Sequence, residues 1–297
     1  AKPERVTLVI PPSGFLIDEF VFPLLGVLKV ATELERGGVI VDVLDLSGVK
    51  DVEERTREHI RTHDTTHYGI TASMPQMPAA VRIARTVREY SNARLILGGP
   101  HVTLLRSSAR LEKSPSRATE MMQALFPLFD ALVCGDGEKA VWKALRADGL
   151  IDADDPKSDL WLTPANLSAA AFPARHLIDI NKYRYEIDGI PTQSMIMQLG
   201  CPYMCGFCGG RRSPFLRRVR RRDATSVNAE MRHLYETYGT RGFMFLDDEL
   251  NVNPKFVEFL ESNILLQKEL GVEFRLRGLV KSELVTVPMA EAMYRAG

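Results

Sequence analysis

Short apolar runs with strand character alternate with helical stretches along the first half of the chain. The runs are Arg5–Ile10, Val39–Leu44, Tyr68–Thr71, Leu95–Leu97 and Ala131–Cys134. Between them, stretches such as Phe22–Arg36 and Ala79–Tyr90 carry apolar residues at helical spacing. Near-continuous apolar strands separated by helices are typical of a parallel sheet covered on both faces. We therefore expect a doubly wound α/β domain over residues 1–145.

The alternation weakens over residues 146–190. This segment is rich in Asp, Pro and Ala and has little periodicity. We interpret it as a connector, partly ordered and lying on the surface.

Strands and helices alternate again after residue 190. Strands are expected at 194–199, 242–247 and 272–278, and helices at Thr225–Tyr238, Pro254–Leu270 and Val287–Ala296. Asp223 or Thr225 is a suitable cap for the first helix, and Pro254 suits an early position of the second. Three strand–helix units predict the N-terminal part of a (β/α) barrel over 191–297. Because three units cannot close a barrel, we expect it to be truncated.

Composition narrows the class of protein. The chain has 297 residues, 45% of them hydrophobic, and 38 basic against 38 acidic side chains. This balance gives no global field that would favour nucleic acid. No apolar run reaches the ~18 residues of a membrane span, and the N-terminus lacks a signal-peptide layout. The four cysteines are not arranged as a disulfide framework, which indicates a reduced, cytoplasmic protein.

Three cysteines lie together on one glycine-rich segment. Cys201, Cys205 and Cys208 are separated by three and two residues, whereas Cys134 ends an apolar strand far away and is expected to be a core residue. Thiolates are ligands for zinc or for iron–sulfur clusters. A structural zinc site needs four protein ligands, and no fourth Cys or His follows nearby. A 4Fe–4S cluster held by three thiolates leaves one iron open.

The segment resembles the cluster loop of the radical S-adenosylmethionine (SAM) superfamily, which has CxxxCxxC after a strand and an aromatic residue before the last Cys. The resemblance implies that SAM chelates the open iron and that Phe207 lies near the adenine. Asp247, Asp248 and Glu249 stand where that superfamily often has Gly-Gly-Glu, which contacts the SAM amino group. Arg277, at the end of the third strand, is a candidate for the SAM carboxylate. Helix capping by the acids and a surface position for the arginine are the alternatives.

Loops at the carboxyl ends of the first-half strands are candidates for a second ligand site. They include PPSG (11–14), TASMP (71–75), GGPH (98–101) and GDGE (135–138). No GxGxxG follows the first strand and no GxxxxGK[ST] occurs, so neither a dinucleotide site nor a P-loop is expected. Glycines at two strand ends suggest a flat, bulky ligand lying against backbone.

In this order, before CxxxCxxC, the loops resemble the flavodoxin-like cobalamin-binding domain of class B radical SAM proteins. The resemblance implies a cobalamin site formed by residues of these loops: Ser13, Gly14, Thr71, Ser73, Met74, Gly98, Gly99, Pro100, His101, Gly135, Asp136, Gly137 and Glu138.

The motif DxHxxG, whose histidine ligates cobalt, is absent from the chain. His67 enters a strand rather than leaving one, so we expect it to be structural. The resemblance therefore implies cobalamin bound without a protein histidine on cobalt. His101 is the one histidine placed to touch the ligand, and Met74 either approaches the corrin or packs in the core.

The basic segment 211–223 has the charge of a nucleic-acid patch but only one aromatic residue, Phe215. Because it directly follows the cysteine segment, we interpret it as a contact to an anionic substrate or to the cobalamin side rather than to nucleic acid.

The family implied is that of cobalamin-dependent radical SAM enzymes with three cofactors: a 4Fe–4S cluster, SAM and cobalamin. Methyl transfer to an unreactive centre of a small-molecule substrate is the leading expectation, and an electron donor must reduce the cluster. Oxidation, cyclisation or rearrangement without methyl transfer is the alternative, and a non-catalytic cobalamin- or metal-binding fragment is another.

Overall fold

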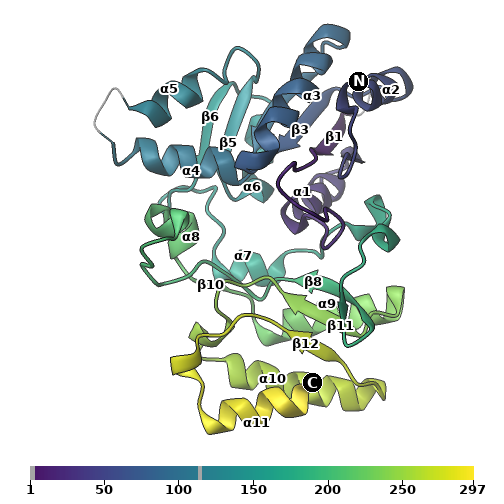
Figure 1. Ribbon diagram of the computed structural model, residues 1–297, viewed down its shortest axis with the longest axis vertical. Helices are drawn as coiled ribbons and strands as arrows, with labels where there is room; N and C mark the ends of the chain where they lie inside the picture. The colour runs from purple at the N-terminus through teal and green to yellow at the C-terminus, as the bar shows by residue number, and fades with distance from the viewer. Residues whose placement is uncertain (1–3, 113–115) are drawn as a thin grey trace.

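A computed structural model describes residues 4–112 and 116–297. In the first half of the chain, parallel strands form a six-stranded sheet in the order β2-β1-β3-β4-β5-β6 (Figure 1). The strands are β1 (Arg5–Ile10), β2 (Ile40–Asp45), β3 (His67–Thr71), β4 (Arg94–Gly98), β5 (Ala131–Gly135) and β6 (Gly149–Ala153).

Helices cover both faces of this sheet, as the near-continuous apolar strands predict. One face packs against α2 (Val52–Thr62), α3 (Met77–Tyr90), α4 (Pro100–Ala109) and α5 (Arg117–Gln123). The other packs against α1 (Leu25–Arg36) and α6 (Gly137–Ala144). Within β1, Val9 faces the first group while Val6, Leu8 and Ile10 face the second. The doubly wound domain expected from the sequence is present.

The first sheet continues beyond the boundary expected at residue 145. β6 pairs with β5 in parallel from Ala131↔Gly149 to Gly135↔Ala153. The sequence missed this strand because Asp152 interrupts its apolar pattern, while Ile151 and Ala153 are buried. The segment 146–190 is therefore not wholly a connector. After β6 it holds α7 (Pro164–Ala169) and short 3-10 turns at Arg175–Leu177 and Ile180–Lys182.

The second half forms a four-stranded sheet in the order β12-β11-β8-β7. β8 (Ile190–Met195), β11 (Gly242–Phe245) and β12 (Arg275–Arg277) are parallel, and the short β7 (Glu186–Ile187) joins β8 as a hairpin. The hairpin turn holds Asp188 and Gly189 at positive φ. These strands share one core with α9 (Ala224–Tyr238), α10 (Phe256–Leu270) and α11 (Val287–Ala296). This arrangement matches the three strand–helix units expected from the sequence.

The boundaries of several elements differ from the expectation, and the strand expected at 272–278 is limited to β12 (Arg275–Arg277). The Asp223 carboxylate accepts a hydrogen bond from the Ser226 N–H and caps α9. Helix α10 begins at Phe256 rather than at Pro254, and a 3-10 turn over Leu250–Val252 precedes it. The strand expected at 194–199 is split into the end of β8 and a separate strand, β9 (Gln198–Leu199).

A small antiparallel ribbon stands at the base of the cysteine segment. β9 pairs with β10 (Arg220–Arg221), and the short helix α8 (Pro214–Arg217) lies just before β10. Figure 1 shows α8, β10 and α7 between the first sheet and the second. Within the described residues, no helix is both long and apolar enough to cross a membrane.

Candidate functional site

A cavity of about 630 Å³ opens at the carboxyl edge of the first sheet. Its wall follows the sheet inward from that edge, between the strands and the helices α1 and α6. Strand residues that line it include Val6, Leu8, Gly69, Ile70, Ile96 and Val133. Natural ligand sites are concave and largely apolar, and this cavity has the size and lining of one.

Most of the residues predicted for the cobalamin site line this cavity. They are Ser13, Thr71, Ser73, Gly98, Gly99, Pro100, Gly135, Asp136, Gly137 and Glu138. Gly14, Met74 and His101 are not among the lining residues. The Met74 side chain is 71% exposed, whereas His101 is buried in α4. No histidine lines the cavity in the described part of the chain.

Two glycines at the cavity edge are required by the protein's own backbone. Gly99 has φ +97°, and a Cβ there would lie 2.7 Å from Thr71 Oγ1. Gly135 has φ +82°, and a Cβ there would lie 2.4 Å from the Ala153 carbonyl carbon. Both the left-handed conformation and the close approach exclude a side chain. Packing between adjacent loops therefore explains these two glycines without a ligand.

Ionisable groups are few in the cavity wall. Glu138 and Asp136 lie at the start of α6, and Lys29 projects from α1. Burial raises the pKa of the Glu138 carboxyl, and the charge of Lys29 opposes that shift. A few charged and polar groups in a mostly apolar wall are the usual means of fixing the orientation of a ligand.

Part of the cavity wall was not predicted from the sequence. α1 contributes Leu25, Gly26, Val27 and Val30, and the loop before it contributes Phe15 and Leu16. Phe15 is 78% exposed, so this loop presents an apolar side chain at the rim. The sequence signal for this part of the wall is the apolar run Phe15-Leu16-Ile17, which follows the turn residues Pro11-Pro12-Ser13-Gly14.

The second half of the molecule closes the same cavity. Ile196, Leu199, Phe215 and Leu216 line it, and all four lie within the segments that flank the cysteines. The cysteine segment and the first sheet therefore meet at one site.

Two buried carboxylates that directly follow strands β5 and β6 hold the segment after the cysteines. Asp136 forms an ion pair with Arg220, whose guanidinium lies 4.1 Å from the Trp161 ring centroid and 5.1 Å from that of Phe215. The Asp154 carboxylate accepts hydrogen bonds from the Ser213 hydroxyl at 2.9 Å and the Phe215 N–H at 2.7 Å.

Three further arginines of the basic segment are also used within the fold. Arg217 donates to the Tyr203 carbonyl, and Arg222 donates to Glu230 at 2.6 Å. Arg221 donates to the Val252 carbonyl at 3.3 Å. These three contacts lie within the second half of the molecule, and a contact of the segment to an anionic substrate or to the cobalamin side stays a prediction.

The three cysteines lie on an open loop that is anchored at Cys201 and makes a turn between Cys205 and Cys208. The Cys201 N–H donates to the Leu216 carbonyl at 2.9 Å, and the Cys208 N–H donates to the Cys205 carbonyl at 3.0 Å. Cys205 is exposed and the other two are half-buried. Burial raises the pKa of the Cys201 thiol, and the nearby Asp248 and Glu249 charges raise it further.

The three sulfur atoms do not converge as ligands of a single ion would. Among the described residues, one group of potential ligands has all its ligand atoms within 4.8 Å of one another. That group is Asp42, His59 and His63, and it does not include the cysteines. One thiolate on each of three irons spaces the sulfurs more widely than one tetrahedral zinc does.

The acidic residues after β11 have distinct positions. Asp247 is buried and accepts hydrogen bonds from the Met197 N–H at 3.0 Å and the Gln198 N–H. Burial raises its pKa to about 7. Asp248 is exposed, while the Oε2 atom of Glu249 is buried without a hydrogen-bond partner in the described structure. The carboxylate of Asp247 is thus used to hold the strand that leads to Cys201.

Near the same loop, the Lys281 ammonium lies 4.3 Å from the Tyr203 ring centroid. Burial raises the pKa of the Glu249 carboxyl, and the charge of Lys281 partly opposes that rise. Sequence reasoning did not select Lys281, because it lies in an irregular segment beyond β12.

Phe207 and Arg277 do not pack against a buried ligand pocket. Phe207 is 93% exposed on the cysteine loop. Arg277 is exposed at the end of β12 and donates to the Tyr185 hydroxyl at 2.8 Å.

His67 and Cys134, which we expected to be structural, lie away from the cavity. His67 begins β3, at the edge of the sheet opposite the cavity, and its Nε2 lies 3.1 Å from the Leu145 carbonyl oxygen. Cys134 is fully buried in the core of the first sheet.

Two curated proteins are similar to the chain over most of its length. An uncharacterised methyltransferase of Pyrococcus horikoshii is 28% identical over 277 residues, 86% of this chain and 55% of that protein. The anaerobic magnesium-protoporphyrin IX monomethyl ester cyclase of Synechocystis is 27% identical over 282 residues, 88% of this chain and 53% of that protein. The chain thus spans about half the length of these relatives. No protein-family model matches it.

Solved structures share the whole fold. The radical SAM methyltransferase TsrM of Kitasatospora setae matches with a TM-score of 0.69 at 18% identity, over 99% of this chain and 58% of that one. The cobalamin-dependent radical SAM enzyme OxsB matches with a TM-score of 0.67 at 13% identity, over 99% of this chain and 42% of that one. The chain has the fold of the cobalamin-dependent radical SAM enzymes, and these comparisons support the family that its motifs predict.

Proposed function

We propose that this chain is part of a radical SAM enzyme that uses a 4Fe–4S cluster and cobalamin to transfer a methyl group to an unreactive centre of a small molecule. One observation carries the proposal: the three-cysteine loop is flanked by residues that line the cavity at the carboxyl edge of the first sheet. A cluster and a corrinoid held at these two places would be adjacent.

The donor set fits an iron–sulfur cluster. Cys201, Cys205 and Cys208 would each hold one iron, since the loop carries them on exposed or half-buried positions anchored by Leu216. The unpaired, buried Oε2 of Glu249 fits an amino group of SAM. Phe207, Asp248, Lys281 and Arg277 are the further candidates for SAM, whereas Asp247 would act by positioning the strand before Cys201.

The cavity fits an extended, mostly apolar part of cobalamin. Small residues at Gly69 and Gly98 leave room along the sheet, and Thr71, Ser73 and Glu138 would supply polar contacts. Since no histidine lines the cavity in the described residues, the proposal includes no protein imidazole on cobalt.

When bound, the cluster with SAM supplies a carbon radical and cobalamin supplies a methyl group. The chain's own residues bind and orient these groups and exclude water with Phe15, Leu16 and Phe215. An external electron donor and a small-molecule substrate complete the proposal.

The test uses the full chain reconstituted anaerobically with iron and sulfide. We expect about four irons per chain, binding of hydroxocobalamin, and 5′-deoxyadenosine from SAM. Replacing any one of Cys201, Cys205 or Cys208 with Ala should abolish iron binding, and Cys134→Ala should retain it. Stoichiometric zinc with no iron in the reconstituted chain would contradict the proposal.

A second candidate is radical chemistry without methyl transfer, favoured by the similarity to a cyclase. SAM labelled in its methyl group separates the two, using the same reconstituted chain. Label recovered with the corrinoid supports methyl transfer. Deoxyadenosine formed without any transfer of label supports the second candidate.

A further inference from the structure

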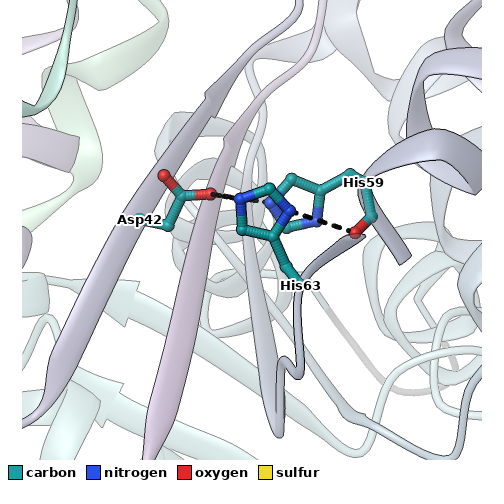
Figure 2. Close-up of side chains that lie close together, drawn as sticks. All are labelled: Asp42, His59 and His63. Atoms are coloured by element: carbon teal, nitrogen blue, oxygen red, sulfur yellow. Dashed lines mark hydrogen bonds and ion pairs between the residues drawn. The ribbon is translucent and has the colours of Figure 1, made fainter. Parts of the chain in front are cut away.

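Two histidines and an aspartate converge on the side of the first sheet away from the cofactor cavity. Asp42 lies in the edge strand β2, His59 lies in the last turn of α2, and His63 follows the end of that helix (Figure 2). The four-residue spacing places the two imidazoles on one side of the helix. Their rings stack in parallel, with centroids 4.0 Å apart and 5° between planes.

The ligand atoms face one another. His59 Nε2 lies 2.7 Å from Asp42 Oδ2, and His63 Nε2 lies 3.8 Å from the same oxygen. All three ligand atoms lie within 4.8 Å of one another, a property shared by no other group of three or more such residues in the described ranges. A Zn²⁺ ion sits about 2.0–2.2 Å from nitrogen or carboxylate ligands, so a small separation of His59 and Asp42 would admit it.

Neighbouring groups orient both rings for metal binding. His59 Nδ1 lies 3.1 Å from the hydroxyl of fully buried Tyr68. His63 Nδ1 lies 2.8 Å from the Thr62 hydroxyl and 3.3 Å from the His59 carbonyl oxygen. Without an ion, the His59 Nε2–H donates to the Asp42 carboxylate. With an ion bound and each ring's proton on Nδ1, both Nε2 lone pairs would face the ion. A hydrogen-bonded second nitrogen is the usual support for a metal-binding histidine.

The Asp42 carboxylate is prepared as an anionic ligand. The hydrogen bond from His59 lowers its pKa, and the charge of His63 lowers it further. The side chains of Asp42 and His63 are 39% and 38% exposed, so an ion reaches them from solvent, while His59 is buried. The alternative is a purely structural role, in which the hydrogen bond between Asp42 and His59 holds α2 against β2. That role does not explain why His63 Nε2 also faces the same Asp42 oxygen.

We propose that Asp42, His59 and His63 bind one divalent zinc-class cation, with the fourth coordination position open to water. Imidazole and carboxylate ligands suit Zn²⁺ and Co²⁺. The bound ion would replace the proton shared between His59 and Asp42, and it would cross-link α2 to the edge strand. This site is independent of the cluster and of the cobalamin cavity.

Cobalt(II) is the probe, because its visible spectrum reports ligand type. The full chain is first reconstituted with iron, and Co²⁺ is then titrated under anaerobic conditions. We expect one Co²⁺ per chain with a weak visible band of nitrogen and oxygen ligands and no thiolate-to-cobalt absorption. Thiolate absorption would identify binding at the cysteine loop, and its appearance without the weak band would overturn the proposal.

Variants locate the ion. His63→Ala removes a half-exposed ligand without opening the core, and we expect at least a tenfold loss of Co²⁺ affinity, as for Asp42→Asn. His176→Ala is the matched control, because the described contacts of His176 consist of a surface pair with Glu35 at 3.0 Å. The Co²⁺ affinity of this variant should equal that of the parent chain. Zn²⁺ should raise the melting temperature of the parent chain and not that of His63→Ala. Equal affinities in the parent chain and His63→Ala would overturn the assignment.

Discussion

At the scale of single residues, the acidic cluster after β11 divides its tasks. Asp247 has both carboxylate oxygens on backbone N–H groups of the strand before Cys201, while Glu249 keeps a buried oxygen unpaired. Adjacent carboxylates in one motif therefore differ in role because their neighbours differ. The resemblance assigned all three to SAM, and the hydrogen bonds of Asp247 indicate a positioning role instead.

The buried position of Asp247 predicts a pH dependence of stability. Its pKa is raised by burial to about 7 in the folded protein, above the ordinary value of 3.8. The folded state therefore holds this proton more tightly than the unfolded state, and its contribution to stability is lost as pH rises from about 4 to 7. The expected loss is roughly 1.4 kcal/mol per pH unit in that window.

Urea unfolding of the cluster-free chain at several pH values measures this effect. Asp247→Asn should remove the fall in unfolding free energy between about pH 4 and 7. Asp148→Asn, at an exposed ion pair with Arg94, should keep that fall. Parallel pH profiles for the parent chain and Asp247→Asn would contradict the argument.

At the scale of elements, buried charges join the two halves of the molecule. β10 carries Arg220 to Asp136 at the start of α6, and α8 is capped by Ser213, which also bonds Asp154. In the connector, Arg175 pairs with Glu230 of α9 at 2.9 Å. These contacts fix the cysteine segment against the first sheet, because a buried charge is stable only beside its partner.

Removing one partner of the Asp136–Arg220 pair should be strongly destabilising. Asp136→Ala leaves the Arg220 guanidinium buried without its counter-charge, and we expect a loss of about 3–5 kcal/mol in the free energy of unfolding. Glu269→Ala breaks the exposed pair with Arg232 and should cost far less, because solvent screens an exposed ion pair. Denaturant unfolding compares the two, and similar losses would show that Asp136 has no special structural role.

At the scale of the whole molecule, the cavity belongs to both halves. Its floor is the first sheet, and Ile196, Leu199, Phe215 and Leu216 close it from the other side. The first domain also needs β6, which the sequence placed in the connector. A division at residue 145 therefore cuts through a sheet rather than between two.

This difference predicts how fragments behave. A fragment of residues 1–145 lacks β6 and leaves the apolar strand β5 at an open edge, which favours aggregation. A fragment of residues 1–163 keeps β6 and the Leu162 N–H that donates to Asp136 at 3.1 Å. Size-exclusion chromatography should find the longer fragment monomeric and the shorter one aggregated. Equal yields of monomer for the two fragments would show that the first domain ends at residue 145 and does not need β6.

The sequence by itself determined the features that depend on local order. The apolar runs specified β1 to β5 and the helices between them, since burial on both faces needs continuous apolar strands. The spacing of Cys201, Cys205 and Cys208 predicted the proposed cluster loop, because all three candidate ligands lie on one short segment. Gly99 and Gly135 were recognised as special, although for their backbone conformation and loop packing rather than for a ligand.

Only the tertiary structure decided the features that depend on distant partners. The pairing of β6 with β5, the use of Asp247 by Met197 and Gln198, and the contribution of α1 to the cavity all join separated segments. The convergence of Asp42 with His59 and His63 is of the same kind, because a strand and a helix meet there through the winding of the sheet. A hydrogen-bond partner is set by position in space, and spacing along the chain does not encode it.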